Sequence, residues 1–301
     1  MTKTIDTLIQ DIYDTLEKGI SVDTPEMRDA LEDFSKDIMY AASDALQEGE
    51  RNGEARLRLS QIGKPDRQIW YGLQGKEGET LSGQTRIKFL MGHILEALLV
   101  LLTKSAGHTV EGQQDEIEVE GVMGHQDCII DDTLVDIKSA SSYAFKKFKE
   151  NRLHEDNPFG YISQISAYAT KNNRKEAAFF AIDKNSGELT ISKVHELEMI
   201  DAPARVRHLK GVQDSNVAPP KCYSDVPDGS SGNKKLAVGC VFCPYKFDCW
   251  SDSNDGRGLR MFRYSNGVRF LTQVIKTPNV EELSINEKEK NTSINTSQTQ
   301  S

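Results

Sequence analysis

The sequence lacks any run of about 18 apolar residues, the length that a membrane-spanning helix needs. Its longest apolar stretch, residues 94–102, is interrupted by Glu96. The N-terminus turns polar at once, which does not fit a secretory signal peptide. Internal repeats are also missing. We therefore expect a cytoplasmic protein that has no membrane partner.

A net positive charge is absent as well, because the 301 residues sum to −9. That total on its own argues against a nucleic-acid partner, but the charge is unevenly distributed. Residues 1–50 hold 13 acidic and 4 basic side chains, and residues 277–301 hold 4 acidic and 2 basic ones. Residues 51–276 therefore carry a net charge of +2. Since the local field matters more than the total, a basic channel for DNA within residues 51–276 is compatible with the sequence.

Cysteine is scarce, which excludes a disulfide-rich scaffold. The five cysteines are an odd number, and three of them crowd together as Cys240, Cys243 and Cys249. In a cytosolic chain such a cluster indicates a metal site before it indicates disulfides.

The hydrophobic pattern predicts an α/β protein with three regions. These are an acidic helical region at 1–50, a mixed domain at 51–276 that includes the cysteine cluster at 222–250, and a disordered polar tail at 277–301. Helices are expected at 5–19, from Thr24-Pro25 to about 49, and at 84–105, 142–150 and 159–172. Strands are expected at 117–120, 122–130, 134–137, 177–182 and 189–194, followed by a hairpin of 259–264 with 268–274.

Three residues in the predicted central hairpin form a set with chemical meaning. Asp136 and Lys138 are two apart, so they project from one face of a strand, and Asp127 on the preceding strand can meet them. Hard carboxylate oxygens hold Mg²⁺ or Mn²⁺, and such an ion assists phosphodiester hydrolysis. A neighbouring lysine can position water or stabilise the transition state. An Asp-x-Lys pair alone could equally be the solvent-facing side of a polar hairpin.

Two helical pairs add to this set. His93 and Glu96 are three apart and share one face of the helix at 84–105, where a carboxylate within an apolar stripe is costly unless it is paired or binds metal. Gln164 and Tyr168 are four apart on the helix after the hairpin, and could hydrogen-bond DNA or a catalytic carboxylate. Ordinary helix packing would explain either pair equally well.

The order of these features resembles the PD-(D/E)XK nuclease superfamily: a helix with a glutamate, then Gly-x-x-Asp, then Asp-x-Lys, then Gln-x-x-x-Tyr. The likeness covers about residues 56–250 and is greatest to the branch with the RecB nuclease domain, CRISPR-associated exonucleases and phage-encoded exonucleases. It implies a restriction-endonuclease-like core, which is a mixed central β-sheet flanked by helices. The N-terminal helical region and a C-terminal cysteine metal-binding region would be additions to that core.

The resemblance also implies roles for individual residues. Glu96, Asp127 and Asp136 would be ligands of Mg²⁺ or Mn²⁺, and Lys138 would be the catalytic lysine. Gln164 and Tyr168 would support the site, and His93 would be a further ligand. The family's histidine lies four residues after the glycine, whereas His93 directly follows Gly92, so Glu96 ranks above His93.

The spacing C-x₂-C-x₅-C matches the C-terminal cysteines of iron–sulfur members of the same branch. Those proteins take a fourth cysteine from upstream of the glutamate-bearing helix, where the matching stretch here, residues 63–67, has none. Cys222 is the available substitute. Four thiolates suit a [4Fe–4S] cluster or, alternatively, Zn²⁺, and spacing does not choose between them.

The resemblance predicts a metal-dependent DNA exonuclease that acts in replication, recombination or host-DNA degradation, in bacterial or phage-infected cytoplasm, alongside replication or recombination proteins. A structure-specific or sequence-specific endonuclease and a non-catalytic nuclease-like DNA-binding module are the alternatives. Basic side chains before and after the central motifs are expected to contact DNA phosphates. They are Arg51, Arg56, Arg58, Lys64, Arg67, Lys146, Lys147, Lys149 and Arg152.

Overall fold

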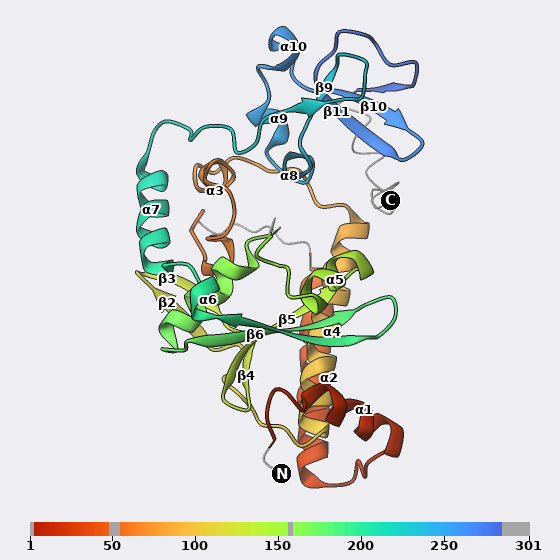
Figure 1. Ribbon diagram of the computed structural model, residues 1–301, viewed down its shortest axis with the longest axis vertical. Helices are drawn as coiled ribbons and strands as arrows, with labels where there is room; N and C mark the ends of the chain where they lie inside the picture. Colours follow the sequence, from red (N-terminus) through yellow and green to blue (C-terminus); the bar gives the residue numbers. More distant parts are fainter. Residues whose placement is uncertain (1–2, 48–54, 156–158, 285–301) are drawn as a thin grey trace. The chain divides into compact units, whose positions relative to one another are not determined.

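The computed structural model describes residues 3–47, 55–155 and 159–284. The chain divides into two compact units (Figure 1). The first comprises residues 1–64 and 86–210, and the second comprises residues 65–85 and 211–301. The sequence had suggested one domain over 51–276 with a separate acidic region before it. Within the described residues, no helix is long and apolar enough to cross a membrane.

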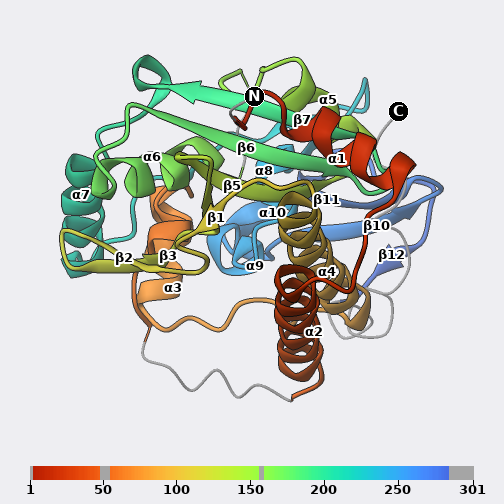
Figure 2. The same cartoon turned by 90° about the horizontal axis from the view of Figure 1, so that it is seen from below.

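The two N-terminal helices that the apolar spacing predicted are present, and both belong to the first unit. In α1 (Leu8–Lys18), Leu8 and Ile12 are fully buried, and Figure 2 shows this helix lying along the central sheet. In α2 (Pro25–Leu46), the Thr24 hydroxyl caps the first turn by accepting a hydrogen bond from the backbone N–H of Met27.

A five-stranded mixed sheet forms the centre of the first unit, with the strand order β1-β4-β5-β6-β7. Its strands are β1 (Val110–Glu111), β4 (Cys128–Ile130), β5 (Thr133–Ala140), β6 (Glu176–Asp183) and β7 (Leu189–His195). The β5–β6 pair is parallel and the other pairs are antiparallel. A parallel pair needs a crossover, which here consists of α5 (Ser142–Lys149) and α6 (Tyr161–Lys171). The predicted mixed sheet flanked by helices is confirmed.

Side chains of β5 point alternately to the two faces of the sheet, which separates apolar core residues from Asp136. Val135 and Ile137 belong to a hydrophobic cluster with residues of α1 and of α4 (Gly83–Ser105). The intervening Asp136 pairs across the sheet with Phe179, which packs against Phe148 of α5. The alternation along β5 therefore places Asp136 on the face of the strand opposite Val135 and Ile137.

The strand predicted at 122–130 is two strands in different sheets. β3 (Val122–His125) pairs with β2 (Glu116–Val119) in a separate hairpin, and β4 begins only at Cys128. Gln126 explains the break, because its buried side chain donates to the carbonyl of Gly112 and accepts from Asn172. Asp127 therefore stands just before a strand, which corrects the expectation that it lies within one.

The second unit contains short helices and a small sheet of order β12-β10-β11-β9-β8. Its strands are β8 (Val226–Pro227), β9 (Lys234–Lys235), β10 (Arg260–Tyr264), β11 (Gly267–Gln273) and β12 (Glu282–Leu283). The helices that involve it are α3 (Asp66–Leu73), α7 (Ala202–Asp214, which begins in the first unit), α8 (Val238–Val241), α9 (Lys246–Cys249) and α10 (Ser253–Gly256). The predicted hairpin at 259–274 is confirmed as β10–β11, whereas α3 and α7 were not predicted.

Part of the segment expected to be disordered is paired. β12 lies antiparallel to β10, Leu283 is buried, and Arg260 forms two hydrogen bonds of 2.7 Å with the carboxylate of Glu282. The ordered chain therefore extends past the boundary predicted at 277. Residues 285–301, the rest of the predicted tail, lie outside the described residues.

Candidate active site

Asp136 and Lys138 lie together on β5, two residues apart, as their spacing predicted. The Nζ atom of Lys138 is 2.5 Å from Oδ2 of Asp136. Asp136 is only 1% exposed, and neither of its carboxylate oxygens has a hydrogen-bond partner of good geometry in the described chain. A buried carboxylate normally satisfies several acceptor positions, so this one retains capacity for a further partner.

Asp127 is brought to the same place by the β4–β5 register. Cys128 pairs with Val135, so the residue before β4 comes opposite Asp136. The Oδ2 atom of Asp127 accepts a hydrogen bond of 2.7 Å from the backbone N–H of Ile137. The side chain is therefore fixed against β5 even though its own backbone is outside the strand.

Glu96 reaches this cluster from α4. Its Oε1 accepts a hydrogen bond of 2.8 Å from the side chain of Gln114, whose backbone N–H donates to the carbonyl of Asp127. His93 is 64% exposed in its side chain, and its Nδ1 lies 3.9 Å from Oε2 of Glu96. The structure thus places Glu96 deeper than His93. Gln114 was not predicted as a site residue, and no motif in the sequence singles it out.

Burial opposes ionisation of the three acids. Burial is the main cause that raises the pKa of Glu96, Asp127 and Asp136. The charge of Asp136 adds to the effect on Asp127, whose pKa is well above its ordinary value. Burial alone would lower the pKa of Lys138, but the negative charges of Asp136 and Asp127 outweigh it and raise that pKa.

Gln164 and Tyr168 are joined to each other on α6. The Gln164 side-chain amide donates to the Tyr168 hydroxyl over 3.3 Å, and Tyr168 is 1% exposed. Burial raises the pKa of Tyr168 to about 12, and the charges of Asp136 and Asp127 also act on it. Tyr168 is therefore a neutral group next to the acids.

Tyr161 is a neighbour of the site that the sequence analysis missed. The Nζ atom of Lys138 lies 5.2 Å from the centre of its ring, a cation–π distance. Tyr161 precedes Tyr168 by seven residues, which is two helical turns, so the two share a face of α6. That spacing was the signal that could have identified it.

The donor set suits a hard divalent ion. Three carboxylates that resist ionisation, one of them buried and short of hydrogen bonds, gain most when a dication is near. In their present positions, no group of three or more His, Cys, Asp or Glu side chains among the described residues is arranged to hold a metal ion.

Four of the five cysteines line one cavity in the second unit: Cys222, Cys240, Cys243 and Cys249. Burial raises the pKa of Cys240 to about 11, and the charges of the other three act on it too. The fifth, Cys128, is buried in the core cluster of the first unit. Since soft thiolates select zinc or iron–sulfur centres, this donor set differs in kind from the carboxylates of the first unit.

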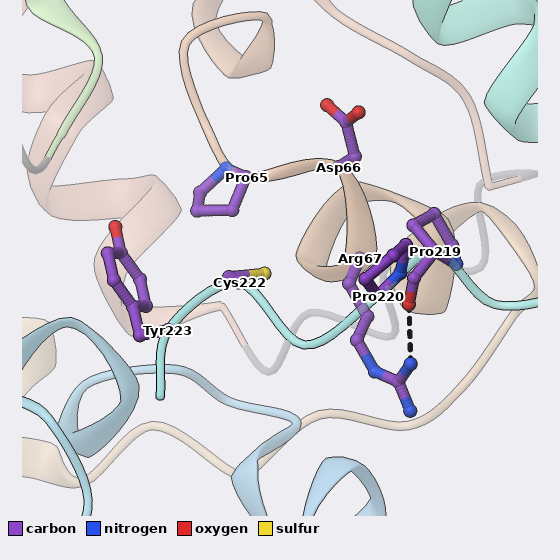
Figure 3. Close-up of a pocket in the computed structure, with 7 residues that line it drawn as sticks. All are labelled: Pro65, Asp66, Arg67, Pro219, Pro220, Cys222 and Tyr223. Atoms are coloured by element: carbon purple, nitrogen blue, oxygen red, sulfur yellow. Dashed lines mark hydrogen bonds between the residues drawn. The ribbon is translucent and has the colours of Figure 1, made fainter. Parts of the chain in front are cut away.

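Pro65 and Arg67 line this cavity together with the cysteines. Cys222 also borders an open pocket of about 380 Å³, shown in Figure 3. There the Arg67 guanidinium donates to the carbonyl of Pro219 over 2.5 Å. Arg67 was expected to contact DNA phosphates, but its guanidinium is engaged in this internal contact.

Five of the other basic residues divide into two groups. Arg56 and Arg58 are exposed, whereas Lys146, Lys149 and Arg152 form ion pairs with surface glutamates. Surface ion pairs are weak, so the second group can still exchange a glutamate for a phosphate. Arg51 lies outside the described residues.

No family model and no curated protein matches the chain. Among solved structures, the chain is similar to SSO0001 at 16% identity with a TM-score of 0.42, over 70% of this chain and 93% of that one. It is also similar to an alkaline exonuclease, LHK-Exo, from Laribacter hongkongensis, at 16% identity and a TM-score of 0.37, over 54% and 91% of the two chains. For LHK-Exo in complex with dAMP the identity is 15% and the TM-score is 0.36, over 54% of this chain and 91% of that one. The assignment of a function therefore depends on the site itself.

Proposed function

We propose that the chain is a metal-dependent DNA nuclease, acting as an exonuclease. The observation that carries the proposal is the buried Asp136 carboxylate, which pairs with Lys138 and has no hydrogen-bond partner of good geometry in the described chain. Asp127 and Glu96 lie near enough for their charges to act on one another. A purely structural ion pair would not need these further acids beside it.

Each residue has a role that its position supports. Asp136, Asp127 and Glu96 would hold Mg²⁺ or Mn²⁺, with His93 as a peripheral ligand at most. A bound ion neutralises charge on the phosphate and lowers the pKa of the attacking water. Lys138 remains protonated at neutral pH, so it acts as a positive hydrogen-bond donor to water or to a phosphate oxygen rather than as a base. Tyr168, with Gln164, would support the site as a neutral neighbour of the acids.

Exonuclease action is preferred to the endonuclease alternatives because the sequence contains no separate DNA-reading motif such as a helix-turn-helix. The complete set of Asp127, Asp136 and Lys138 disfavours a non-catalytic DNA-binding module. The proposed setting is replication, recombination or host-DNA degradation in bacterial or phage-infected cytoplasm, with proteins of those processes as partners.

One experiment separates the three alternatives. The protein is incubated with Mg²⁺, Mn²⁺ or EDTA, and with linear DNA whose ends are free or blocked by hairpins. An exonuclease degrades only the free-ended DNA, and only with a divalent ion. Cleavage of the blocked DNA would identify an endonuclease, and DNA binding without any cleavage would leave the binding module.

The second proposed centre is formed by Cys222, Cys240, Cys243 and Cys249, holding a [4Fe–4S] cluster or Zn²⁺. The stretch that supplies the fourth cysteine in similar proteins does line the cavity here, through Pro65 and Arg67, and Cys222 lines it as well. The four thiols line one cavity, which is where such a centre would be held.

A further inference from the structure

A ladder of aromatic rings leads from the core of the first unit to its surface beside Lys138. Phe159 stacks on Tyr161, with ring centres 5.6 Å apart and an angle of 29° between planes. Tyr161 in turn lies 6.1 Å from the ring of Phe148, and Lys138 Nζ is 5.2 Å from the Tyr161 ring centre. The outer member, Phe159, is 59% exposed. A large apolar ring is thus held open to solvent one ring away from the proposed catalytic lysine.

The backbone after Phe159 is fixed by a close contact between two glycines. A Cβ atom on Gly160 would lie 2.5 Å from Cα of Gly63, so neither position accepts a side chain without displacement of the other. Gly160 also has a φ of +74°, in the region that favours glycine. Arg205 of α7 fastens the opposing segment by donating to the carbonyls of Ile62 and Lys64 over 2.9 Å. This anchoring means that the exposed ring is positioned by the fold.

An exposed phenylalanine offers a flat π-face and no hydrogen bonds. Its natural ligand is another flat ring, and bases stack on aromatic side chains without sequence preference. A base inside a duplex already has neighbours on both faces, so only a terminal or unpaired base has a face to offer. The adjacent Lys138, and the Asp136 carboxylate with which it pairs, would act on a phosphate of that same strand.

We propose that Phe159 is a stacking platform for an unpaired base of the strand held at Lys138, and that the site therefore takes single-stranded DNA or frayed ends. This proposal rests on the nuclease function proposed above and names its substrate class. Phe159 is a specificity-determining residue in this view, because it binds the base and leaves the chemistry to the acids and Lys138.

The test uses oligonucleotides with 2-aminopurine, a base whose fluorescence falls on stacking, placed at successive positions from one end. Binding is measured with the full chain in Ca²⁺ instead of Mg²⁺, so that affinity is read without cleavage. Phe159→Ala is expected to weaken single-strand binding by roughly 10-fold, since stacking on an aromatic residue contributes about 1–3 kcal/mol per base. It should also abolish quenching at one position. Phe159→Trp should retain both, and binding to hairpin-capped duplex should be weak for every variant.

Tyr40→Ala is the matched control, because Tyr40 is an exposed aromatic (68%) on α2, outside the ladder. It should change neither quenching nor affinity. Wild-type quenching and affinity in Phe159→Ala would overturn the proposal, as would equal binding of capped duplex and single strands. If Phe159-dependent quenching occurs but the wild type cleaves no DNA in Mg²⁺ or Mn²⁺, the platform stands and the nuclease function fails. The two proposals are therefore distinguishable.

Discussion

The carboxylate of Asp127 accepts a hydrogen bond of 2.7 Å from the backbone N–H of Ile137, the residue between Asp136 and Lys138. This contact ties the irregular segment before β4 to the strand that carries the ion pair. It also holds a second acid beside Asp136, where burial makes both costly to ionise and the charge of Asp136 adds to the cost for Asp127. Buried acids with raised pKa values are common at functional sites, where their function offsets the cost of burying them.

Replacing the ion pair on β5 should remove cleavage without removing the fold. Asp136→Asn keeps the side-chain shape but loses the charge that a divalent ion needs, so cleavage in Mg²⁺ should fall by on the order of 1,000-fold. The cleavage rate of Lys138→Ala should fall by on the order of 100-fold or more, because one charged hydrogen-bond donor is lost. Both are measured as initial rates of DNA hydrolysis, with circular dichroism to verify folding.

Asp132→Asn is the control for these variants. Asp132 is in the turn between β4 and β5, and its side chain is 88% exposed. Its φ of 65° suits asparagine as well as aspartate. This variant should cleave at the wild-type rate. Near-wild-type rates in Asp136→Asn would show that the centre is elsewhere.

The raised pKa of Asp127 predicts a particular pH dependence of stability. The folded chain binds this proton more tightly than the unfolded chain does, so folding is favoured at low pH. In EDTA, the free energy of unfolding should therefore decrease as pH rises from the ordinary pKa of 3.8 up through the raised one. Asp127→Asn should flatten this part of the profile, measured as Tm against pH.

The raised pKa values also predict how a divalent metal ion should change the stability of the fold at different pH values. A dication favours the ionised acids, so Mn²⁺ should raise Tm more at pH 8 than at pH 5, and Asp136→Asn should lose that increment. Metal stabilisation that is equal at both pH values, or unchanged in Asp136→Asn, would contradict the assignment of these acids as ligands.

The sequence predicted the elements whose pattern is local. The apolar period of α1, the Thr24-Pro25 start of α2 and the alternation of β5 each follow from neighbouring residues, and the structure has them all. The i, i+2 spacing of Asp136 and Lys138 likewise determined their common face.

Features set by distant partners were not predictable in this way. The break at Gln126 depends on Gly112 and Asn172, which are 14 and 46 positions away. The hydrogen bond from Gln114 to Glu96 and the ring of Tyr161 over Lys138 also need the folded chain. The helix α3 was missed because its eight residues give too short a segment for a helical apolar period to be recognised from the sequence.

Two truncations test where the ordered chain ends. Removal of residues 285–301 should leave Tm unchanged, because that segment contains few apolar side chains to offset ordering entropy. Removal of residues 279–301 also deletes β12, the buried Leu283 and the Glu282 carboxylate that pairs with Arg260. Tm should then fall by about 2–4 °C for each kcal/mol lost. Equal Tm values for the two truncations would show that β12 contributes nothing to stability.

The cysteine cavity leads to the last prediction, which separates a metal centre from ordinary thiols. Chain purified without oxygen should contain iron and absorb visible light if it holds an iron–sulfur cluster, or contain one zinc and be colourless. Cys222→Ser should lower metal content, because Cys222 lines the cavity with the other three thiols. Cys240→Ser should lower metal content and Tm together, since Cys240 also packs against Trp250 and Leu259.

Cys128→Ser is the matched control for both cysteine variants, because Cys128 lies in the core of the first unit, apart from the cavity. It can lower Tm by placing a hydroxyl in an apolar core, but metal content should not change. Loss of metal in Cys128→Ser as well would mean that general destabilisation empties the centre. Full metal content in Cys222→Ser would exclude Cys222 as a ligand. If the wild-type chain contains no metal and has a normal Tm, the four cysteines that line the cavity are ordinary thiols. DNA cleavage is measured on the same samples. If the cysteine centre supports only the fold, the cleavage rate of each variant should be proportional to its folded fraction.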